Sequence, residues 1–341
     1  MRITLVQPDP LQRISGGYLY NRKLSQACEC MTLLSVPEEQ LPEVVGALSP
    51  TRRDWVLADS LFLNQTALAP FFELERRRSC HVGLVLHALP SFVRQAQATG
   101  DSAPAGFAPD AAELELLARL HAVICPGPYL PRALGELGVW ASWLICPPGA
   151  PPLAEARASD GEVGVLSVSN VTRGKGLLDA VHALSTLREL PWRWQLVGSL
   201  DWDPAFVAEL REAVHARGLD ERVVFRGQLD HQETLEQYRT SQLLLLPSRT
   251  ENTPLVILEA QASGLPTVAY AIGGVPDLVA HEENGLLAPA YDIDLLASHL
   301  RRLIEDAAQR RRFGAHALTV AASRPSWPEV AVEFERRLSA F

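Results

Sequence analysis

Two glutamates with seven residues between them, Glu251 and Glu259, are the residues whose types and spacing most directly suggest chemistry. The pair Thr253-Pro254 predicts a helix start between them, with the threonine hydroxyl as N-cap and proline at the first helical position. Glu259 would then lie about six residues, or roughly 9 Å, into the helix. The unpaired N–H groups of the first turn form an anion site between the two carboxylates. This layout fits a sugar nucleotide, and it fits equally a helix with one dipole-favoured acid and one solvated acid.

Positively charged side chains recur in the loops after the predicted strands of the second half, although the whole chain has a net charge of −9. These side chains are Arg173, Lys175, Arg226 and Arg249. The carboxyl ends of parallel strands line one crevice, so we predict a phosphorylated ligand there, although each cation alone is an ordinary surface residue. No carboxylate cluster typical of a metal-bridged diphosphate is present, so we expect no metal and no cofactor, with cations in the place of magnesium.

Two features of the first half fit the same kind of ligand. Gly16-Gly17 lies between a predicted strand and a predicted helix, where a double glycine lets a ligand approach the backbone, although a plain tight turn fits as well. His87 ends a predicted strand, which is where open α/β sheets bind ligands. A lone histidine is more often structural, but its place at the strand end favours a function.

The cysteines do not form a familiar metal-binding motif. They are Cys28, Cys30, Cys80, Cys125 and Cys146. The spacing of Cys28-x-Cys30 is shorter than that of a usual zinc pair. We therefore expect these residues to be reduced thiols of a cytoplasmic protein.

Alternating strands and helices must position the candidate residues. Apolar runs predict strands in the first half at 2–7, 55–59, 82–87, 121–125 and 142–146, and in the second at 163–168, 194–198, 223–227, 243–246, 267–270 and 284–287. Helical segments between them predict an α/β fold of two Rossmann-like, doubly wound parallel sheets. Four prolines in Pro147–Pro152 predict an interdomain linker that extends to about Gly161. The predicted domains are 1–150, joined by a last helix at 327–341, and 151–326.

Composition excludes several classes of protein. The chain has 341 residues, of which 47% are hydrophobic and 21% charged, so it can bury two cores. Its acidity argues against nucleic-acid partners and against stable docking on an anionic membrane, while transient membrane contact is not excluded. We expect no signal peptide and no transmembrane segment, since no apolar stretch reaches roughly 20 residues.

The carboxylate pair also resembles the E-x7-E signature of retaining glycosyltransferases of the GT-B fold, and most closely that of glycosyltransferase family 4. Other motifs resemble that family in the same order and spacing: Val168-Ser-Asn-Val-Thr-Arg-Gly-Lys-Gly176, Phe225-Arg-Gly227, Leu246-Pro-Ser248, Glu259-Ala-Gln-Ala-Ser-Gly-Leu-Pro266, Gly273-Gly-Val-Pro276 and Asn284-Gly-Leu-Leu287. The resemblance is strong in the second half and weak in the first. It implies two domains facing each other across a cleft, with the acceptor site in the first and the nucleotide-sugar donor site in the second.

The resemblance implies a role for each matching residue. Glu259 would bind the ribose hydroxyls, Glu251 would lie near the transferred sugar, and Lys175 would neutralise the leaving diphosphate. His87 would contact the donor sugar. Further implied donor contacts are Gly16, Gly17, Asn170, Arg173, Arg226, Asn252, Thr253, Leu255 and Val256.

Two positions depart from the family pattern. Asn170 stands where many members carry an arginine, so we expect Arg173 to supply that charge; Asp277 stands where a glutamate is common. The resemblance implies a metal-independent, retaining hexosyltransferase that uses a UDP-sugar or GDP-sugar. Its acceptor is an unidentified small molecule, glycan or lipid-linked compound. The alternatives are a sugar-nucleotide epimerase or phosphorylase of the same fold, and an inactive transferase-like scaffold.

Overall fold

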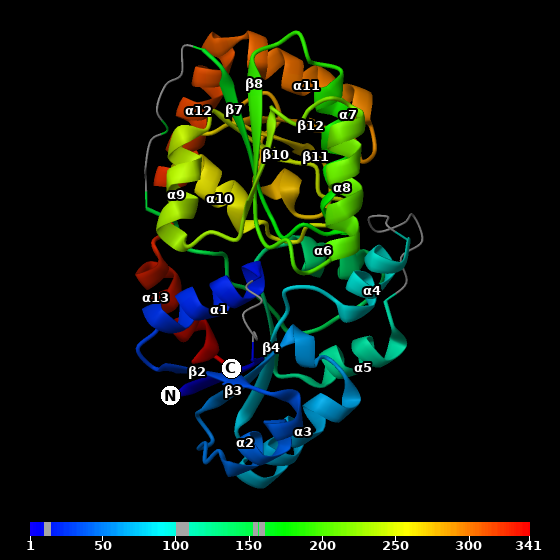
Figure 1. Ribbon diagram of the computed structural model, residues 1–341. Helices are drawn as coiled ribbons and strands as arrows, with labels where there is room; N and C mark the ends of the chain where they lie inside the picture. Colours follow the sequence, from blue (N-terminus) through cyan, green and yellow to red (C-terminus); the bar gives the residue numbers. More distant parts are fainter. Residues whose placement is uncertain (10–14, 100–108, 153–155, 157–160) are drawn as a thin grey trace. The chain divides into compact units, whose positions relative to one another are not determined.

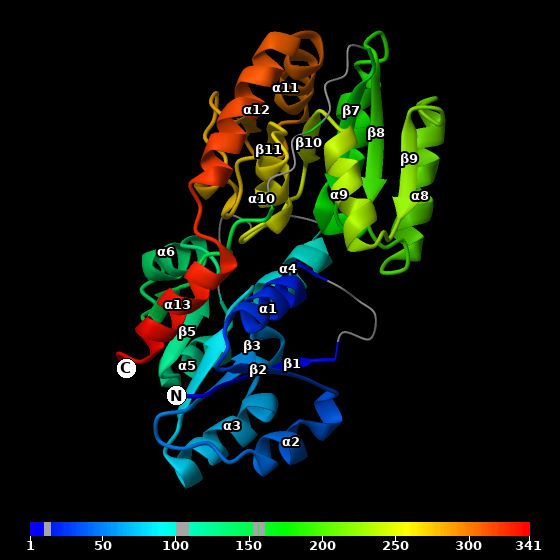
Figure 2. The same ribbon diagram turned by 90° about the vertical axis from the view of Figure 1, so that its left-hand side faces the viewer.

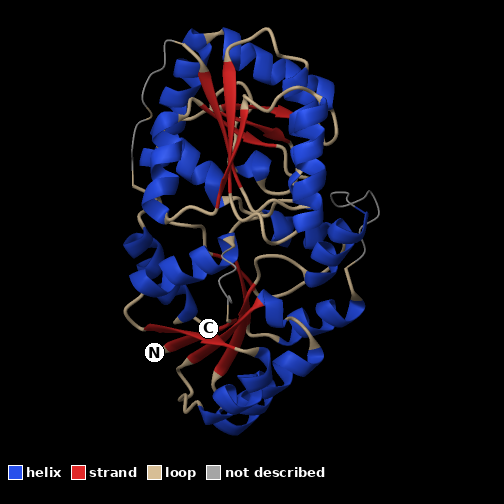
Figure 3. Cartoon of the chain, viewed as in Figure 1, coloured by secondary structure: helices blue, strands red, loops and turns tan. Residues whose placement is uncertain are grey.

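The computed structural model describes residues 1–9, 15–99, 109–152, 156 and 161–341. The chain forms two compact units, each built around one sheet. The first comprises Met1–Gln95, Ala105–Gly149 and Pro325–Phe341, and the second is built mainly from Ala150–Arg324. Each sheet has six parallel strands with helices packed on it (Figure 3). The expected α/β fold with two doubly wound sheets is therefore confirmed.

The sheet of the second unit has the strand order of a dinucleotide-binding fold. Its strands are β7 (Val163–Val168), β8 (Trp192–Val197), β9 (Val223–Gly227), β10 (Leu243–Leu246), β11 (Thr267–Tyr270) and β12 (Gly285–Ala288). Their spatial order is β12-β11-β10-β7-β8-β9. The chain therefore adds β8 and β9 on one side of β7, and then β10, β11 and β12 on its other side. The boundary between β7 and β10 is the topological switch point, where the loops after the two strands diverge and leave room for a ligand.

Helices cover both faces of this sheet (Figure 1). They are α7 (Leu177–Ser185), α8 (Pro204–Ala216), α9 (His231–Thr240), α10 (Leu255–Ala262), α11 (Ile293–Glu305) and α12 (Ala307–Ala322). Leu243 and Leu245 of β10 join the core under α7, α8 and α11, whereas Leu244 and Leu246 join the core under α9 and α10. The strand is a continuous apolar run because both of its faces are buried.

The first sheet has a different order. Its strands are β1 (Ile3–Pro8), β2 (Met31–Val36), β3 (Trp55–Asp59), β4 (His81–Val85), β5 (Ala122–Cys125) and β6 (Trp143–Ile145), arranged as β2-β1-β3-β4-β5-β6. Its switch point therefore lies between β1 and β3. The sequence analysis missed β2, because this edge strand is only partly buried and its sequence neither alternates nor forms an unbroken apolar run.

The helices of the first half and the last helix are α1 (Gly16–Ala27), α2 (Leu41–Ala47), α3 (Gln65–Arg78), α4 (Pro90–Thr99), α5 (Ala111–Arg119), α6 (Tyr129–Glu136) and α13 (Trp327–Leu338). In the first unit α13 packs beside α1, as both ribbon views show (Figures 1 and 2). Short 3-10 turns occur at Glu38–Gln40, Ser60–Phe62, Arg173–Lys175 and Val275–Asp277. The last helix thus returns to the unit that contains the N-terminus.

The proline-rich segment meets the start of α13. Gly149 lies so close to Trp327 that a Cβ at position 149 would be 2.5 Å from the Trp327 nitrogen, which explains why glycine is needed there. The division between units falls at this point, between Gly149 and Ala150. Residues 153–155 and 157–160 of the predicted linker lie outside the described residues. A search of the described helices finds none with the length and apolarity that a membrane span requires.

Candidate functional site

The loops at the switch point of the second sheet bring two predicted residues into contact. Lys175 follows β7 and Glu251 follows β10, and the Lys175 Nζ donates to Glu251 Oε1 at 2.7 Å. The exposed fractions of their side chains are 30% and 12%, so the pair is reachable but largely shielded from water. Sequence reasoning gave these residues separate roles and did not predict that they touch.

Glycines allow the loops to pack this closely. Gly176 has a φ of +61°, and a side chain there would overlap the Pro247 carbonyl group. Gly273 has a φ of +54°, and a side chain there would overlap the Glu251 carbonyl oxygen. That oxygen accepts a hydrogen bond of 3.0 Å from the Gly274 N–H. The loop after β11 therefore fixes the backbone that carries Glu251.

The helix that begins beside Glu251 starts later than predicted. α10 begins at Leu255 with Pro254 as its N-cap, so the prediction of Thr253 as N-cap and Pro254 as first helical residue was wrong. Residues 252 and 253 instead form bends, because the Glu251 carbonyl bonds to the Gly273 loop rather than to the helix. No side chain caps α10, so the N–H groups of Leu255 and Val256 are oriented for an anion.

Two hydroxyl groups in the same loop are buried. Ser248 Oγ and Thr250 Oγ1 are buried, and neither hydroxyl has a hydrogen-bond partner among the described residues. Buried polar atoms are almost always satisfied, so unsatisfied ones beside an uncapped helix start indicate room for a polar ligand. Sequence reasoning missed both hydroxyls. Their position directly after an apolar strand was the signal that could have identified them.

Glu259 is held by a buried tyrosine from α9. Tyr238 donates its hydroxyl hydrogen to Glu259 Oε2 at 2.9 Å. Burial and the nearby carboxylate both raise the pKa of Tyr238 well above its usual value, so the hydroxyl keeps its proton and remains a donor. This hydrogen bond orients the carboxylate on the second turn of α10.

The arginines of the predicted cationic cluster bind other side chains. Arg249 forms an ion pair of 2.8 Å with buried Asp179, which also accepts a hydrogen bond from Tyr270. Burial alone would lower the pKa of Arg249, but Asp179 raises it, so the guanidinium stays charged. Arg249 thus anchors the loop after β10, and its backbone N–H donates to the Gly174 carbonyl at 2.9 Å in the Lys175 loop.

The other predicted polar residues of this unit are more dispersed. Arg173 pairs with Glu209 of α8, and exposed Arg226 donates to Gln195 Oε1 at 2.9 Å. Asn170 Oδ1 accepts from the Ser199 backbone N–H at 3.3 Å and so joins the loops after β7 and β8. Among the described residues, Lys175 is therefore the predicted cation that the structure places against Glu251.

In the first unit the predicted residues form a second polar cluster. Gly17 packs against the His87 ring, because a Cβ at position 17 would be 3.0 Å from His87 Cδ2. His87 Nε2 lies 2.9 Å from Asn21 Oδ1, and Asn21 Nδ2 donates to Asp59 Oδ2 at 2.7 Å. Asn21 also donates to Gln7 Oε1 at 3.0 Å. Because the Asn21 amide nitrogen donates both of these hydrogen bonds, the Asn21 amide oxygen accepts the hydrogen bond from His87. The Nε2 atom of His87 therefore carries the ring proton.

This histidine is neutral near pH 7. Burial lowers the pKa of His87, and the nearby Asp59 opposes that change only in part. Sequence reasoning found His87 and Gly17 and noted that Asp59 ends a strand, but it missed Asn21 and Gln7. Asn21 lies on the first turns of α1, where spacing from Gly17 predicts the same helix face.

Comparison with known proteins shows what the second unit is similar to. Residues 154–319 match the family model described as Glycosyl transferases group 1. The D-inositol 3-phosphate glycosyltransferase of Xylanimonas cellulosilytica is 33% identical over 167 residues, which are 49% of this chain and 40% of that protein. The N-acetyl-alpha-D-glucosaminyl L-malate synthase of Bacillus anthracis is 30% identical over 162 residues, covering 47% and 40%. The matched segment thus spans about two fifths of these relatives.

Solved structures resemble the whole chain. A sucrose-phosphate synthase from Thermosynechococcus elongatus has a TM-score of 0.80 at 21% identity, with both chains fully covered. Anabaena HepE in complex with UDP-glucose has a TM-score of 0.81 at 19% identity, again over all of both chains. At these identities the likeness establishes the fold, which is that of GT-B glycosyltransferases.

Proposed function

We propose that this chain is a retaining, metal-independent glycosyltransferase of family 4 that transfers a sugar from a nucleoside-diphosphate sugar to an acceptor hydroxyl. The observation that carries the proposal is the contact between Lys175 and Glu251 beside the uncapped start of α10, at the switch point of a domain that matches the glycosyl transferases group 1 model. Structural neighbours with bound UDP or UDP-glucose favour a UDP-sugar donor, with a GDP-sugar as the second candidate.

The proposed division of roles follows the geometry of the second unit. Glu259, oriented by Tyr238, binds the ribose hydroxyls. The N–H groups at the start of α10 bind phosphate oxygens, and Lys175 neutralises the charge that develops on the leaving diphosphate. Glu251 then keeps Lys175 in place and accepts from a hydroxyl of the transferred sugar. The acceptor attacks from the side of the leaving group, and the departing phosphate takes its proton.

The remaining predicted contacts complete this proposal. Asn170, Arg173, Asn252 and Thr253 follow strands of the second unit, and Arg226 lies near the end of β9. All five are proposed donor contacts. From the first unit we propose contacts by Gly16 and Gly17, which the structure places at the start of α1 rather than in a turn before it, and by His87, whose ring packs against Gly17. The acceptor is left open among small molecules, glycans and lipid-linked compounds.

Calorimetric titration with UDP and GDP tests the donor site directly. We expect binding of one nucleotide that is unchanged when magnesium is replaced by a chelator. A screen of UDP-sugars and GDP-sugars for thermal stabilisation, followed by hydrolysis assays on the hits, then identifies the donor. Nucleotide binding that disappears with the chelator would overturn the metal-independent mechanism.

The anomeric configuration of the product tests the stereochemistry. Nuclear magnetic resonance of the first product formed from the donor should show the anomeric configuration of the donor itself. An inverted product would exclude the retaining mechanism. Interconversion of donor epimers without transfer would indicate an epimerase instead.

A further inference from the structure

Two thiols and a carboxylate meet in the first unit. Cys28 Sγ lies 3.6 Å from Cys30 Sγ and 3.0 Å from Glu335 Oε1. The ligand atoms of these residues all lie within 4.8 Å of one another, and no other group of three or more such ligands comes this close within the described ranges. All five cysteines are free thiols.

Rigid elements hold these three side chains. Cys28 is the C-cap of α1, and its carbonyl oxygen accepts from the Met31 N–H at 3.0 Å. The Cys30 carbonyl oxygen accepts from the Ile3 N–H at 2.8 Å, which ties the turn to β1. Glu335 lies on α13, between the buried residues Phe334 and Leu338. The site therefore joins the start of the chain to its last helix across 307 positions.

Glu335 forms no ion pair with the residues that the structure describes. This carboxylate is partly buried, and among the side chains that the structure describes no arginine, lysine or histidine pairs with it. Its hydrogen bond comes from the Cys28 thiol, which is a weak donor. Partly buried carboxylates normally have a cation or several strong donors, so this environment is suited to a bound cation.

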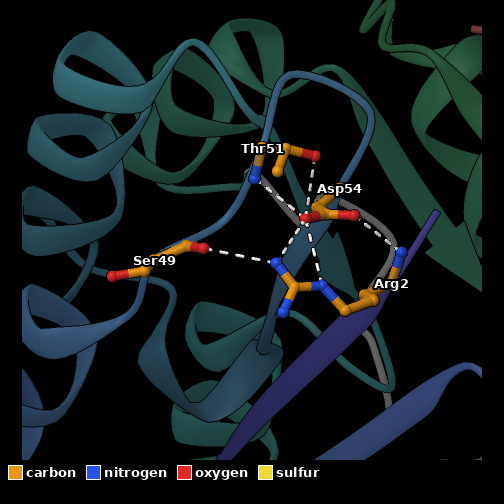
Figure 4. A network of polar contacts seen from close by, with 4 residues as sticks. All are labelled: Arg2, Ser49, Thr51 and Asp54. Atoms are coloured by element: carbon orange, nitrogen blue, oxygen red, sulfur yellow. Dashed lines mark hydrogen bonds and ion pairs between the residues drawn. The ribbon is translucent and has the colours of Figure 1, made fainter.

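A neighbouring hollow gives access to the site. A space of about 300 Å³ is lined by Cys30, Glu29, Arg2 and Asp54, among others. Asp54 is already satisfied, since the Arg2 guanidinium and the Thr51 N–H and hydroxyl all bond to it (Figure 4). Burial alone would raise the pKa of Asp54, but these hydrogen bonds hold it well below its usual range. The hollow thus admits an ion and water to Cys30 without offering Asp54 as a competing ligand.

From this geometry we propose that Cys28, Cys30 and Glu335 bind one Zn²⁺ ion, with water from the hollow as the fourth ligand. Thiolate and carboxylate ligands at the usual zinc distances are separated by roughly 3.5–3.8 Å in a tetrahedral site, and the observed separations need only small side-chain movements to reach these values. Binding displaces the thiol protons, and both thiolates and the carboxylate then face the cation. The Cys28-x-Cys30 spacing is shorter than that of a usual zinc pair, so the sequence alone did not predict a metal site. The proposed site is possible because Glu335 of α13 provides a third ligand.

This zinc would be structural and separate from sugar transfer. Cys28 lies at the far end of the 12-residue α1 from Gly16, a separation of roughly 18 Å. It precedes β2, whereas His87 follows β4, so the two residues lie toward opposite ends of parallel strands. The metal would link α1 to α13 and so fasten the last helix to the first unit. The proposal does not depend on the proposed function.

Cobalt substitution in the reduced full-length chain tests the site. One equivalent of Co²⁺ should produce the intense visible absorption of a tetrahedral ion together with thiolate-to-metal bands, and Zn²⁺ should abolish both. Saturating Zn²⁺ should raise the melting temperature by about 5 °C, because it binds the folded chain preferentially. Cys30→Ser should lose the spectrum, and Glu335→Gln should weaken Co²⁺ binding at least tenfold.

Glu333→Gln is the matched control, since Glu333 lies on the same helix but is exposed and pairs with Arg336. It should bind Co²⁺ like the wild type. Circular dichroism of each variant without metal establishes that it is folded. The proposal is overturned if the reduced wild type shows no tetrahedral spectrum, or if Cys30→Ser retains it. UDP titration of Cys30→Ser should match the wild type, so the outcomes for the two proposals are separable.

Discussion

The switch point of the second sheet carries an ion pair, whereas that of the first sheet carries a hydrogen-bonded network around a neutral histidine. Lys175 and Glu251 meet beside an uncapped helix start, with unsatisfied hydroxyls nearby. In the first unit Asn21 connects a neutral His87 to Asp59 and Gln7, so that these side chains satisfy one another. The second site is thus poised for an anion, and the first is a preformed wall of neutral and acidic groups.

This difference between the two switch points parallels how strongly each half of the chain resembles known proteins. The matched family model covers residues 154–319 and so lies in the second unit. The ligand proposed for that unit is chemically constant: a diphosphate with a ribose on one side and a sugar on the other. Charge and helix N–H groups suit any such donor. A site that distinguishes acceptors needs side chains particular to each protein, which fits the weak resemblance of the first half. We expect mutations to separate these two kinds of site.

Removing the cation of the second unit should have the largest effect. Lys175→Ala should lower kcat roughly 100- to 1000-fold, because the leaving diphosphate loses a preorganised positive group. The measurement is initial rates with the donor found in the screen, together with thermal unfolding. Lys23→Ala, which removes the other lysine of the chain, is the control and should change neither. If Lys175→Ala loses stability in proportion to activity, the lysine is structural and the contrast between the units fails.

Displacing the backbone of Glu251 should have the next largest effect. Gly273→Ala should weaken UDP binding about 30-fold, because the added methyl group overlaps the Glu251 carbonyl and moves the start of α10. Gly138→Ala in the first unit also faces a positive φ but has open space around it, so it should cost only about 1 kcal/mol of unfolding free energy and leave UDP binding intact. Calorimetry and urea unfolding provide both values. Equal effects of the two substitutions on binding would contradict the proposed role of the loop.

Two substitutions of different severity test the proposed contact between Glu259 and the ribose. Glu259→Ala should weaken UDP binding about tenfold through loss of charge-assisted hydrogen bonds. Tyr238→Phe removes only the hydrogen bond that orients Glu259 and should weaken binding about threefold. Both are measured by calorimetry with UDP. Unchanged affinity in Glu259→Ala would remove its ribose role, whatever the result for tyrosine.

The smallest effect should come from the first unit and concerns stability against pH. Burial lowers the pKa of His87 in the folded state, so as pH falls from about 7 to about 5 the unfolded chain takes up a proton that the folded chain refuses. This histidine therefore contributes a loss of stability on acidification. His87→Asn should make the dependence shallower but not flat, because burial also lowers the pKa of His81 and His299.

Urea unfolding at about pH 7 and about pH 5 measures how steeply the unfolding free energy depends on pH. His182→Asn, at an exposed position, is the control and should keep the slope of the wild type. A slope that stays unchanged in His87→Asn would mean that this histidine titrates alike in the folded and unfolded chains. The assignment of His87 as a neutral histidine would then be wrong.

Much of the fold and part of the site could be predicted from the sequence. Apolar runs of four to six residues between helical segments indicated eleven of the strands, because a strand buried on both faces must be apolar throughout. β2 was missed because an edge strand escapes that requirement. The prediction that Glu251, Lys175 and Glu259 belong to one sheet edge depended only on their positions after or near strand ends.

What the sequence determined by itself was local: the periodicity of each element, the residue types at the strand ends, and the glycines where positive φ is needed. The tertiary structure decided which side chains and backbone groups those residues contact. Arg249 binds Asp179 rather than an anion, Lys175 binds Glu251, and α10 begins after a loop that another loop holds in place. Local patterns depend on residues a few positions apart, whereas these pairings depend on which distant loops the strand order brings together. For the same reason, the sequence around Cys28-x-Cys30 did not indicate a metal site, because the third proposed ligand, Glu335, lies on the distant helix α13.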